Sequence, residues 1–319
     1  MSPGPAPRHG AAPVASITQL VGRTPLVRLR RIGAGLPGIR VYAKCEFMNP
    51  GGSVKDRPAL GMIEAGLADG RVRPGATVLD ATSGNTGVAY AWICAALGLR
   101  CTLVMPSNVS AARKRIVRAY GAEIVFSSPL DGSDGAIRKA RELVAAAPER
   151  FFYSDQYGNE ENPRAHERGT AVEIAEALGG RVAAFVAGIG TGGTVMGTSR
   201  GLRALAPGVR CVAVEPEEPL HGLEGLKHMA SSIVPPIYRE AELDQKISMP
   251  TGEAWAMTER LAREEGLRVG HSSGAAVAGA LRVARELAAA GVEGDVVTVL
   301  PDRAERYLEP RRWDRRITW

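Results

Sequence analysis

Thr77-Val-Leu-Asp-Ala-Thr-Ser-Gly-Asn-Thr-Gly87 is a short apolar run that ends in a loop of hydroxyl groups and glycines. The apolar segment from Val88 to Leu97 follows directly and has the length of a helix. A strand, a polar loop and a helix in this order form the unit of proteins whose parallel sheets are covered by helices on both faces. The stretch therefore predicts an α/β fold, with the loop at the carboxyl edge of a parallel sheet.

The same alternation continues on both sides of this stretch, and no internal repeat of fixed period is visible. The region 215–249 is expected to be less regular, because prolines and glycines interrupt it. Upstream we expect a short helix, an extended segment over 26–29, a strand over 41–46 and a helix over 55–70. Downstream we expect strands over 101–105, 123–126, 183–187, 210–214 and 296–300, and helices over 111–120, 134–146, 167–178, 194–204, 251–265 and 275–290.

Length and charge restrict the class of protein. The chain has 319 residues and a net charge of +6, which suits one large or two moderate domains and favours small anionic ligands. The arginines are spread along the chain rather than gathered as in a nucleic-acid binder, apart from a tail of four between 311 and 316. We expect that tail to be a solvated end.

The four cysteines, at 45, 94, 101 and 211, form no Cys-x-x-Cys pair and have no zinc spacing with histidine, so we predict reduced core residues and no metal site. Residues 1–13 are rich in Pro, Gly and Ala, and we expect a disordered tail that is neither signal peptide nor anchor. No apolar run has the length of a membrane span. A cytoplasmic location is expected.

A glycine turn, Asn49-Pro-Gly-Gly-Ser-Val-Lys55, precedes a helical pattern and places Lys55 near a helix start. The helix dipole is positive there, so the Lys55 amine should lose its proton more easily than an amine on an open surface. Taken alone, a lysine in such a turn is more often a solvated charge. Lys44, a few residues upstream, is expected to be dispensable for activity.

Two further loops follow predicted strands. Thr82-Ser-Gly-Asn-Thr-Gly87 offers several hydroxyls, an amide and free backbone N–H groups. A helix cap needs only one such residue, so the loop is better explained as a binding site for a carboxylate. Gly188-Ile-Gly-Thr-Gly-Gly-Thr194 exposes its backbone at a helix start and indicates a phosphate site. It is not a P-loop, because no lysine follows, but it fits Gly-x-Gly-x-x-Gly with Glu215 after the next strand. A dinucleotide site therefore stays open at this point.

A third loop, Gly270-His-Ser-Ser-Gly-Ala275, also opens a helix, and a serine there could be an ordinary cap. A nucleophilic lysine together with a phosphate loop suggests pyridoxal 5′-phosphate, whose aldehyde reacts with lysine and whose phosphate binds glycine-rich backbone.

These stretches, in order and together with Pro301-Asp-Arg-Ala-Glu-Arg-Tyr307, resemble the motifs of the cysteine synthase (O-acetylserine sulfhydrylase) family, of B-type character. That family belongs to the tryptophan-synthase-β group, fold type II, of enzymes that use pyridoxal 5′-phosphate. The resemblance covers roughly residues 16 to 307. It implies two α/β domains with parallel sheets flanked by helices: a large one over 14–49 and 160–319 that binds the cofactor phosphate, and a smaller, mobile, substrate-binding one over 50–159.

The resemblance also implies roles for single residues. Lys55 would bind the cofactor and move the substrate proton, Asn85 would contact the ring oxygen, and Ser272 would contact the ring nitrogen. The phosphate would lie against Gly190, Thr191, Gly192, Gly193 and Thr194. The substrate carboxylate would be held by Thr82, Ser83, Gly84, Thr86 and Gln156.

The implied reaction replaces the β-substituent of O-acetyl-L-serine or O-phospho-L-serine by sulfur, through an aminoacrylate, to give L-cysteine. The sulfur donor would be sulfide, thiosulfate or a thiocarboxylate. A serine rather than an aspartate at the ring nitrogen makes the ring a weaker electron sink, which favours elimination over transamination. A homodimer is also implied, with no nucleic-acid or membrane partner.

Two other functions and the roles of two residues stay open. Cystathionine β-synthase, which joins serine to homocysteine, shares these motifs, and a nucleotide-dependent oxidoreductase would need only the glycine fingerprint and Glu215. Lys227 lies in a loop that is basic in the B-type branch, and it is expected either to bind an anionic substrate group or to be a surface lysine. His271 stands where the family more often has an apolar residue, and we interpret it as a bystander or as a residue that tunes the pocket.

Overall fold

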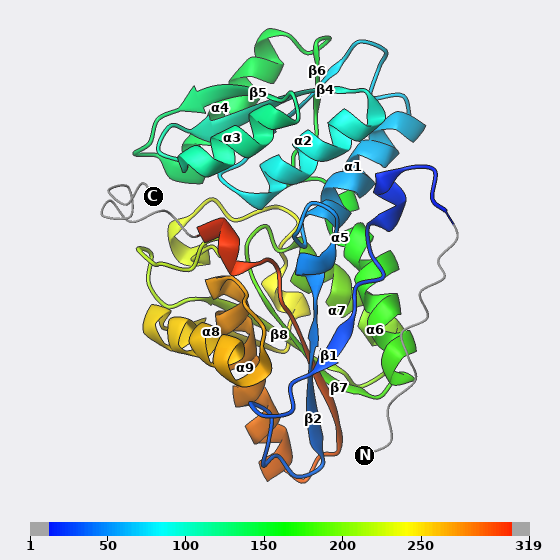
Figure 1. Cartoon of the computed structure of the whole chain (residues 1–319), viewed down its shortest axis with the longest axis vertical. Coiled ribbons are helices and arrows are strands. Elements are labelled where there is room, and N and C mark those ends of the chain that lie inside the picture. The colour runs from blue at the N-terminus through cyan, green and yellow to red at the C-terminus, as the bar shows by residue number, and fades with distance from the viewer. Residues whose placement is uncertain (1–12, 308–319) are drawn as a thin grey trace, which may run out of the picture.

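The structure is a computed structural model that describes residues 13–307. Within this range the strands form two separate sheets, one of four strands and one of six (Figure 1). The predicted domain boundaries, at 49/50 and 159/160, fall before α1 (Asp56–Ala68) and before α5 (Glu161–Ala165). They remain a prediction. The predicted basic tail and residues 1–12 of the predicted disordered segment lie outside the described residues.

The smaller sheet has the strand order β5-β4-β3-β6, and all of its pairs are parallel. Its buried apolar side chains pack against α1, α2 and α3 on one face and against α4 on the other. The bounds are β3 (Thr77–Ala81), α2 (Asn85–Leu97), β4 (Arg100–Pro106), α3 (Ala111–Ala119), β5 (Glu123–Ser127), α4 (Gly132–Ala146) and β6 (Phe151–Tyr153).

The larger sheet has the order β1-β2-β10-β7-β8-β9. Helices α8 and α9 cover one face of it, and α6 and α7 cover the other (Figure 1). The strands are β1 (Leu26–Arg28), β2 (Ile39–Lys44), β7 (Val182–Gly188), β8 (Arg210–Pro216), β9 (Gln245–Met249) and β10 (Gly294–Val299). The helices are α6 (Ala171–Leu178), α7 (Gly193–Leu205), α8 (Thr251–Glu265) and α9 (His271–Ala289).

The structure confirms the α/β class but corrects several details. Strand β1 pairs antiparallel with β2, because the connection between them contains no helix that could carry the chain back for a parallel pairing. Strands β6 and β9 were not predicted, since one has only three residues and the other lies in the proline-rich region. The predicted helix over 167–178 is α6 preceded by a π-helical turn, His166–Thr170, that joins it to α5.

The third loop is also shorter than predicted. Helix α9 begins at His271, so Ser272 lies in its first turn and Gly270 is the N-cap. The serines resemble cap residues, which is why the sequence suggested a turn there.

A buried charge network fixes the start of α1. The guanidinium of Arg57 donates to Glu46 at 2.7 and 2.9 Å and to Glu173 at 2.7 Å, and Lys44 donates to Glu173 at 2.6 Å. Lys44 is 2% exposed. Lys44 is therefore part of the framework that holds the Lys55 turn, and the expectation that Lys44→Ala keeps its activity remains a prediction.

We expect Glu173→Ala to lower the free energy of unfolding by about 3 kcal/mol, because it leaves buried positive charge without its carboxylate. Burial alone would raise the pKa of Glu173, but hydrogen bonds and charge from Arg57 outweigh it and lower the pKa to about 2. The wild-type carboxylate thus stabilises the fold above its unfolded pKa of about 4.3, and this contribution is lost as pH falls toward 2.

Urea unfolding at pH 7 and at pH 3 measures this difference. Glu142→Ala, which removes an exposed partner of Lys139, is the control and should leave stability unchanged at both pH values. An equal loss of stability in Glu173→Ala at both pH values would contradict the ion-pair role.

Candidate active site

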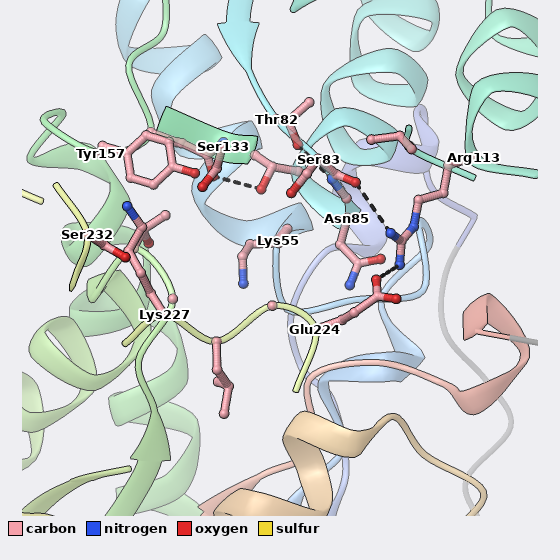
Figure 2. Close-up of a pocket in the computed structure, with 18 of the residues that line it drawn as sticks. Lys55, Thr82, Ser83, Asn85, Arg113, Ser133, Tyr157, Glu224, Lys227 and Ser232 are labelled. Atoms are coloured by element: carbon pink, nitrogen blue, oxygen red, sulfur yellow. Dashed lines mark hydrogen bonds and ion pairs between the residues drawn. The ribbon is translucent and has the colours of Figure 1, made fainter. Parts of the chain in front are cut away.

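A cleft of roughly 660 Å³ lies between the loops that follow β3 and β4 and a loop that follows β8. A narrower pocket shares Lys55, Asn85 and Thr191 with it and extends toward Ser272. The structure thus brings together residues from all three loops that the sequence singled out. Figure 2 shows Lys55, Asn85 and Lys227 extending from different elements toward the cavity.

Lys55 is the N-cap residue of α1, as the glycine turn predicted. Gly52 has φ of +77°, a conformation that other residues adopt only with strain. Burial of the ammonium lowers the pKa of Lys55 below its ordinary value, and the nearby carboxylate of Asp302 opposes this shift. The direction agrees with the sequence-based expectation, and desolvation is its cause.

The loop after β3 is braced by its own hydroxyl groups. The Thr82 hydroxyl accepts from the amides of Gly84 and Gly87, at 3.2 and 3.1 Å, and Thr86 donates to Gln156 at 2.8 Å. The Gln156 amide in turn donates to the Ala81 carbonyl at 2.6 Å. Helix α2 begins within this loop, so its first N–H groups lack helical acceptors and stand at the cleft. The loop can therefore bind a carboxylate by its backbone while its side chains keep it rigid.

The glycine-rich loop after β7 opens α7, whose N-cap Gly192 has φ of +91°. Side chains at 190 and 193 would overlap the Gly225 carbonyl and Asn162, respectively, so only glycine fits these positions. The Thr191 hydroxyl accepts from Asn162 at 3.1 Å. This is an anion cradle at a helix N-terminus.

The contacts of Glu215 argue against a dinucleotide-binding site. Its carboxylate accepts from the Met229 amide and pairs with Lys246, both at 3.1 Å, and the residue is 6% exposed. A ribose ligand needs this carboxylate to be free at the pocket. The Gly-x-Gly-x-x-Gly match therefore reflects the phosphate loop alone.

Lys227 is not a surface lysine. It is 8% exposed, and its ammonium donates to Asp134 of α4 at 2.9 Å and to the Ile233 carbonyl at 3.0 Å. The ammonium also lies 5.4 Å from the centre of the Tyr157 ring. His271, by contrast, packs against Trp255 with ring centres 4.9 Å apart.

Sequence reasoning missed several residues at the site. Arg113 of α3 donates to Glu224 at 2.5 Å beside the cleft, as Figure 2 shows. His166 lies under the glycine-rich loop, 3.2 Å from the Thr194 hydroxyl, and burial lowers its pKa to about 3, so that it is neutral. Asp302 accepts a hydrogen bond from the Asn85 side-chain amide at 2.5 Å. Arg113 follows a predicted strand, and that position could have identified it.

The residues present fit pyridoxal 5′-phosphate. Its phosphate matches the N-terminus of α7 and its aldehyde matches the desolvated Lys55 amine. Its ring nitrogen and the hydroxyl oxygen on the ring have Ser272 and Asn85, respectively, in the same pocket. A Cβ at 190 or 193 would meet the Gly225 carbonyl or Asn162, so the loop keeps bare backbone at these two positions. No helix in the part of the chain that the structure describes is long and apolar enough to cross a membrane.

Comparisons with known proteins agree with this chemistry. A cysteine synthase of Aquifex aeolicus (strain VF5) is 48% identical over 295 residues, which cover 92% of this chain and 90% of that protein. The crystal structure of a cysteine synthase from Entamoeba histolytica has a TM-score of 0.89 at 33% identity, with 97% of this chain and 93% of that chain covered. An O-acetylserine-dependent cystathionine β-synthase from Helicobacter pylori has a TM-score of 0.86 at 34% identity, with 94% and 99% covered.

The model of one protein family, described as pyridoxal-phosphate dependent enzyme, matches residues 17–302 of this chain. The match includes Lys55, the loop after β3, the loop after β7 and Ser272. The chain therefore belongs to the family of pyridoxal-phosphate dependent enzymes.

Proposed function

We propose that this protein is a cysteine synthase, which makes L-cysteine from an activated serine with pyridoxal 5′-phosphate as its cofactor. One observation carries the proposal: a desolvated lysine amine stands between an anion cradle at a helix N-terminus and a rigid carboxylate-binding loop. The similarity to cysteine synthases over more than nine tenths of the chain supports it.

The cofactor, when bound, supplies an electron sink for the bond that breaks at the substrate α-carbon. Lys55 then has two tasks, to release the cofactor to the incoming amino acid and to take the α-proton at its Nζ. A lowered pKa serves both, because a neutral amine is needed as nucleophile and as base. The same Nζ returns the proton after sulfur has added.

The substrate carboxylate is held by the loop from Thr82 to Thr86 with Gln156. Ser83 has the exposed position in the cleft, while Thr82 and Thr86 brace the loop from within. Binding at the start of α2 fixes the α-carbon relative to Lys55 and excludes water from the amine. The loop therefore orients the proton that Lys55 removes.

Ser272 is 4% exposed and lies in the first turn of α9. The helix dipole is positive there, which disfavours a proton on the ring nitrogen, and a serine hydroxyl does not supply one. A ring that stays unprotonated withdraws electrons weakly. Loss of a good β-leaving group is then easier than formation of a long-lived carbanion.

We also propose that residues 50–159 move as the smaller domain and that the protein is a cytoplasmic homodimer. Apolar side chains exposed near the N-terminus, at Ile17, Leu20 and Val27, offer a surface for a second copy.

We expect Lys55→Ala to be colourless after purification and to have no measurable turnover, because the cofactor loses its covalent attachment and the substrate its base. Lys139→Ala, which removes an exposed lysine of α4, is the control and should stay yellow and active. Borohydride should fix the cofactor on Lys55 in the wild type. A yellow, active Lys55→Ala protein would overturn the assignment.

Lys227 lines the cleft, and an anionic substrate group that reached its ammonium would replace the bond to Asp134. We expect Lys227→Ala to lower kcat/KM for O-phosphoserine about tenfold more than for O-acetylserine, since a charge-assisted hydrogen bond contributes about 1.5–3 kcal/mol. Asp134→Asn should act in the opposite direction, because it frees the Lys227 ammonium. Equal losses for both substrates in both variants would show that Lys227 only ties the loop to α4.

The resemblance to the Helicobacter pylori enzyme makes cystathionine synthesis the second candidate. We expect O-acetylserine with sulfide to be used with a higher kcat/KM than O-acetylserine with homocysteine. Steady-state rates with both acceptors at matched concentrations decide the point, and a preference for homocysteine would contradict the proposed activity.

A further inference from the structure

The segment 301–307, which follows β10, runs between the loops that carry the three cofactor side chains. The Pro301 carbonyl accepts from the Val54 amide at 2.8 Å, next to Lys55. The Asp302 carbonyl accepts from the Gly270 amide at 3.1 Å, at the start of the helix that carries Ser272. This segment therefore contacts the loops of Lys55 and Ser272 through its backbone.

Two side chains of the segment form hydrogen bonds with Asn85, the third residue that we expect to contact the cofactor. The Asn85 Nδ2 donates to Asp302 Oδ2 at 2.5 Å, and Arg306 Nη1 donates to Asn85 Oδ1 at 2.6 Å. An acid at one end and a cation at the other define which end of the carboxamide is oxygen and which is nitrogen. A flipped amide would place N–H against guanidinium and oxygen against carboxylate.

Asp302 and Arg306 are themselves held in place. Asp302 is 1% exposed and also accepts from the Tyr307 hydroxyl, while Arg306 donates a second bond to the Gly51 carbonyl. The Asn85 nitrogen has two hydrogens, and Asp302 uses one of them. The second remains for an acceptor in the cofactor pocket, which Asn85, Asp302 and Lys55 all line.

We infer that Asp302 and Arg306 are positioning residues, which fix the Asn85 carboxamide so that its free N–H points at the cofactor ring oxygen. The inference rests on the proposed role of Asn85 as partner of that oxygen. The competing explanation is that the pair only ties the end of β10 to the start of α2. The two differ in one respect: a positioning residue acts on the cofactor through Asn85, whereas a structural tie acts without it.

A double-mutant cycle on the holoenzyme separates them. The variants are Asp302→Ala, Asn85→Ala and the double variant, and the readouts are the dissociation constant of pyridoxal 5′-phosphate and the long-wavelength absorption band of the bound cofactor. We expect each single variant to weaken cofactor binding about tenfold or more, as loss of one charge-assisted hydrogen bond predicts. The double variant should be no weaker than Asn85→Ala alone.

Conservative variants and a matched control sharpen the test. Asp302→Asn keeps an acceptor oxygen and should restore most of the binding and of the absorption band. Arg306→Ala should weaken cofactor binding as Asp302→Ala does. It replaces Asp302→Ala in the cycle if that variant does not fold. Asp295→Ala removes another buried carboxylate, paired with Arg40 at the opposite end of β10, and should leave cofactor binding unchanged.

The outcomes are distinct. If Asp302→Ala weakens binding equally in the presence and absence of the Asn85 side chain, the positioning role is wrong and the role of Asn85 stands. If Asn85→Ala itself binds the cofactor like the wild type, the proposed role of Asn85 is wrong, and the inference falls with it.

Discussion

The desolvation of a single amine constrains the whole site. A lysine ammonium that loses water must gain a partner, lose its proton or destabilise the fold. Here the pKa of Lys55 is lowered by burial, and the opposing carboxylate, Asp302, is already engaged by Asn85 and Tyr307. The start of α1 can hold such a residue because the Arg57 network anchors the first turn of the same helix. The reactivity of the Lys55 amine therefore depends on the ion pairs of Arg57, which hold this end of the helix in place.

The sequence predicts those features that depend on local pattern. The residue pattern predicts the strand over 77–81, the loop after it and the helix that follows. It also predicts that the lysine turn and the glycine-rich loop lie at helix starts, as the structure has them. In these segments the secondary-structure propensities, the capping residues and the hydrophobic pattern all favour the same structure. They can therefore be predicted from the sequence. Strand β9 was missed because Ile247 and Met249 provide only two inward positions in a proline-rich region.

The rest could not be predicted, because it depends on pairs distant in sequence. Asn85 and Asp302 are separated by 217 positions, and Lys227 and Asp134 by 93, yet each pair lies within hydrogen-bond distance. Periodicity carries no information about such pairings. The same limit applies to Lys44, whose partner, Glu173, lies on α6, 129 positions further along the chain.

Two pairs that are distant in sequence connect the loop over 222–233 to helices that cover the four-stranded sheet. Glu224 pairs with Arg113 of α3, and Lys227 pairs with Asp134 of α4. The movement proposed for residues 50–159 would have to separate both pairs if it opened the cleft along that loop. They differ in shielding: the Glu224 side chain is 54% exposed, whereas that of Asp134 is 24% exposed and that of Lys227 is 9% exposed. Salt screens exposed charges more strongly than buried ones. At physiological ionic strength the Lys227–Asp134 pair is therefore the less screened of the two contacts, and under the role proposed for Lys227 an anionic substrate group would compete with Asp134 for the same ammonium.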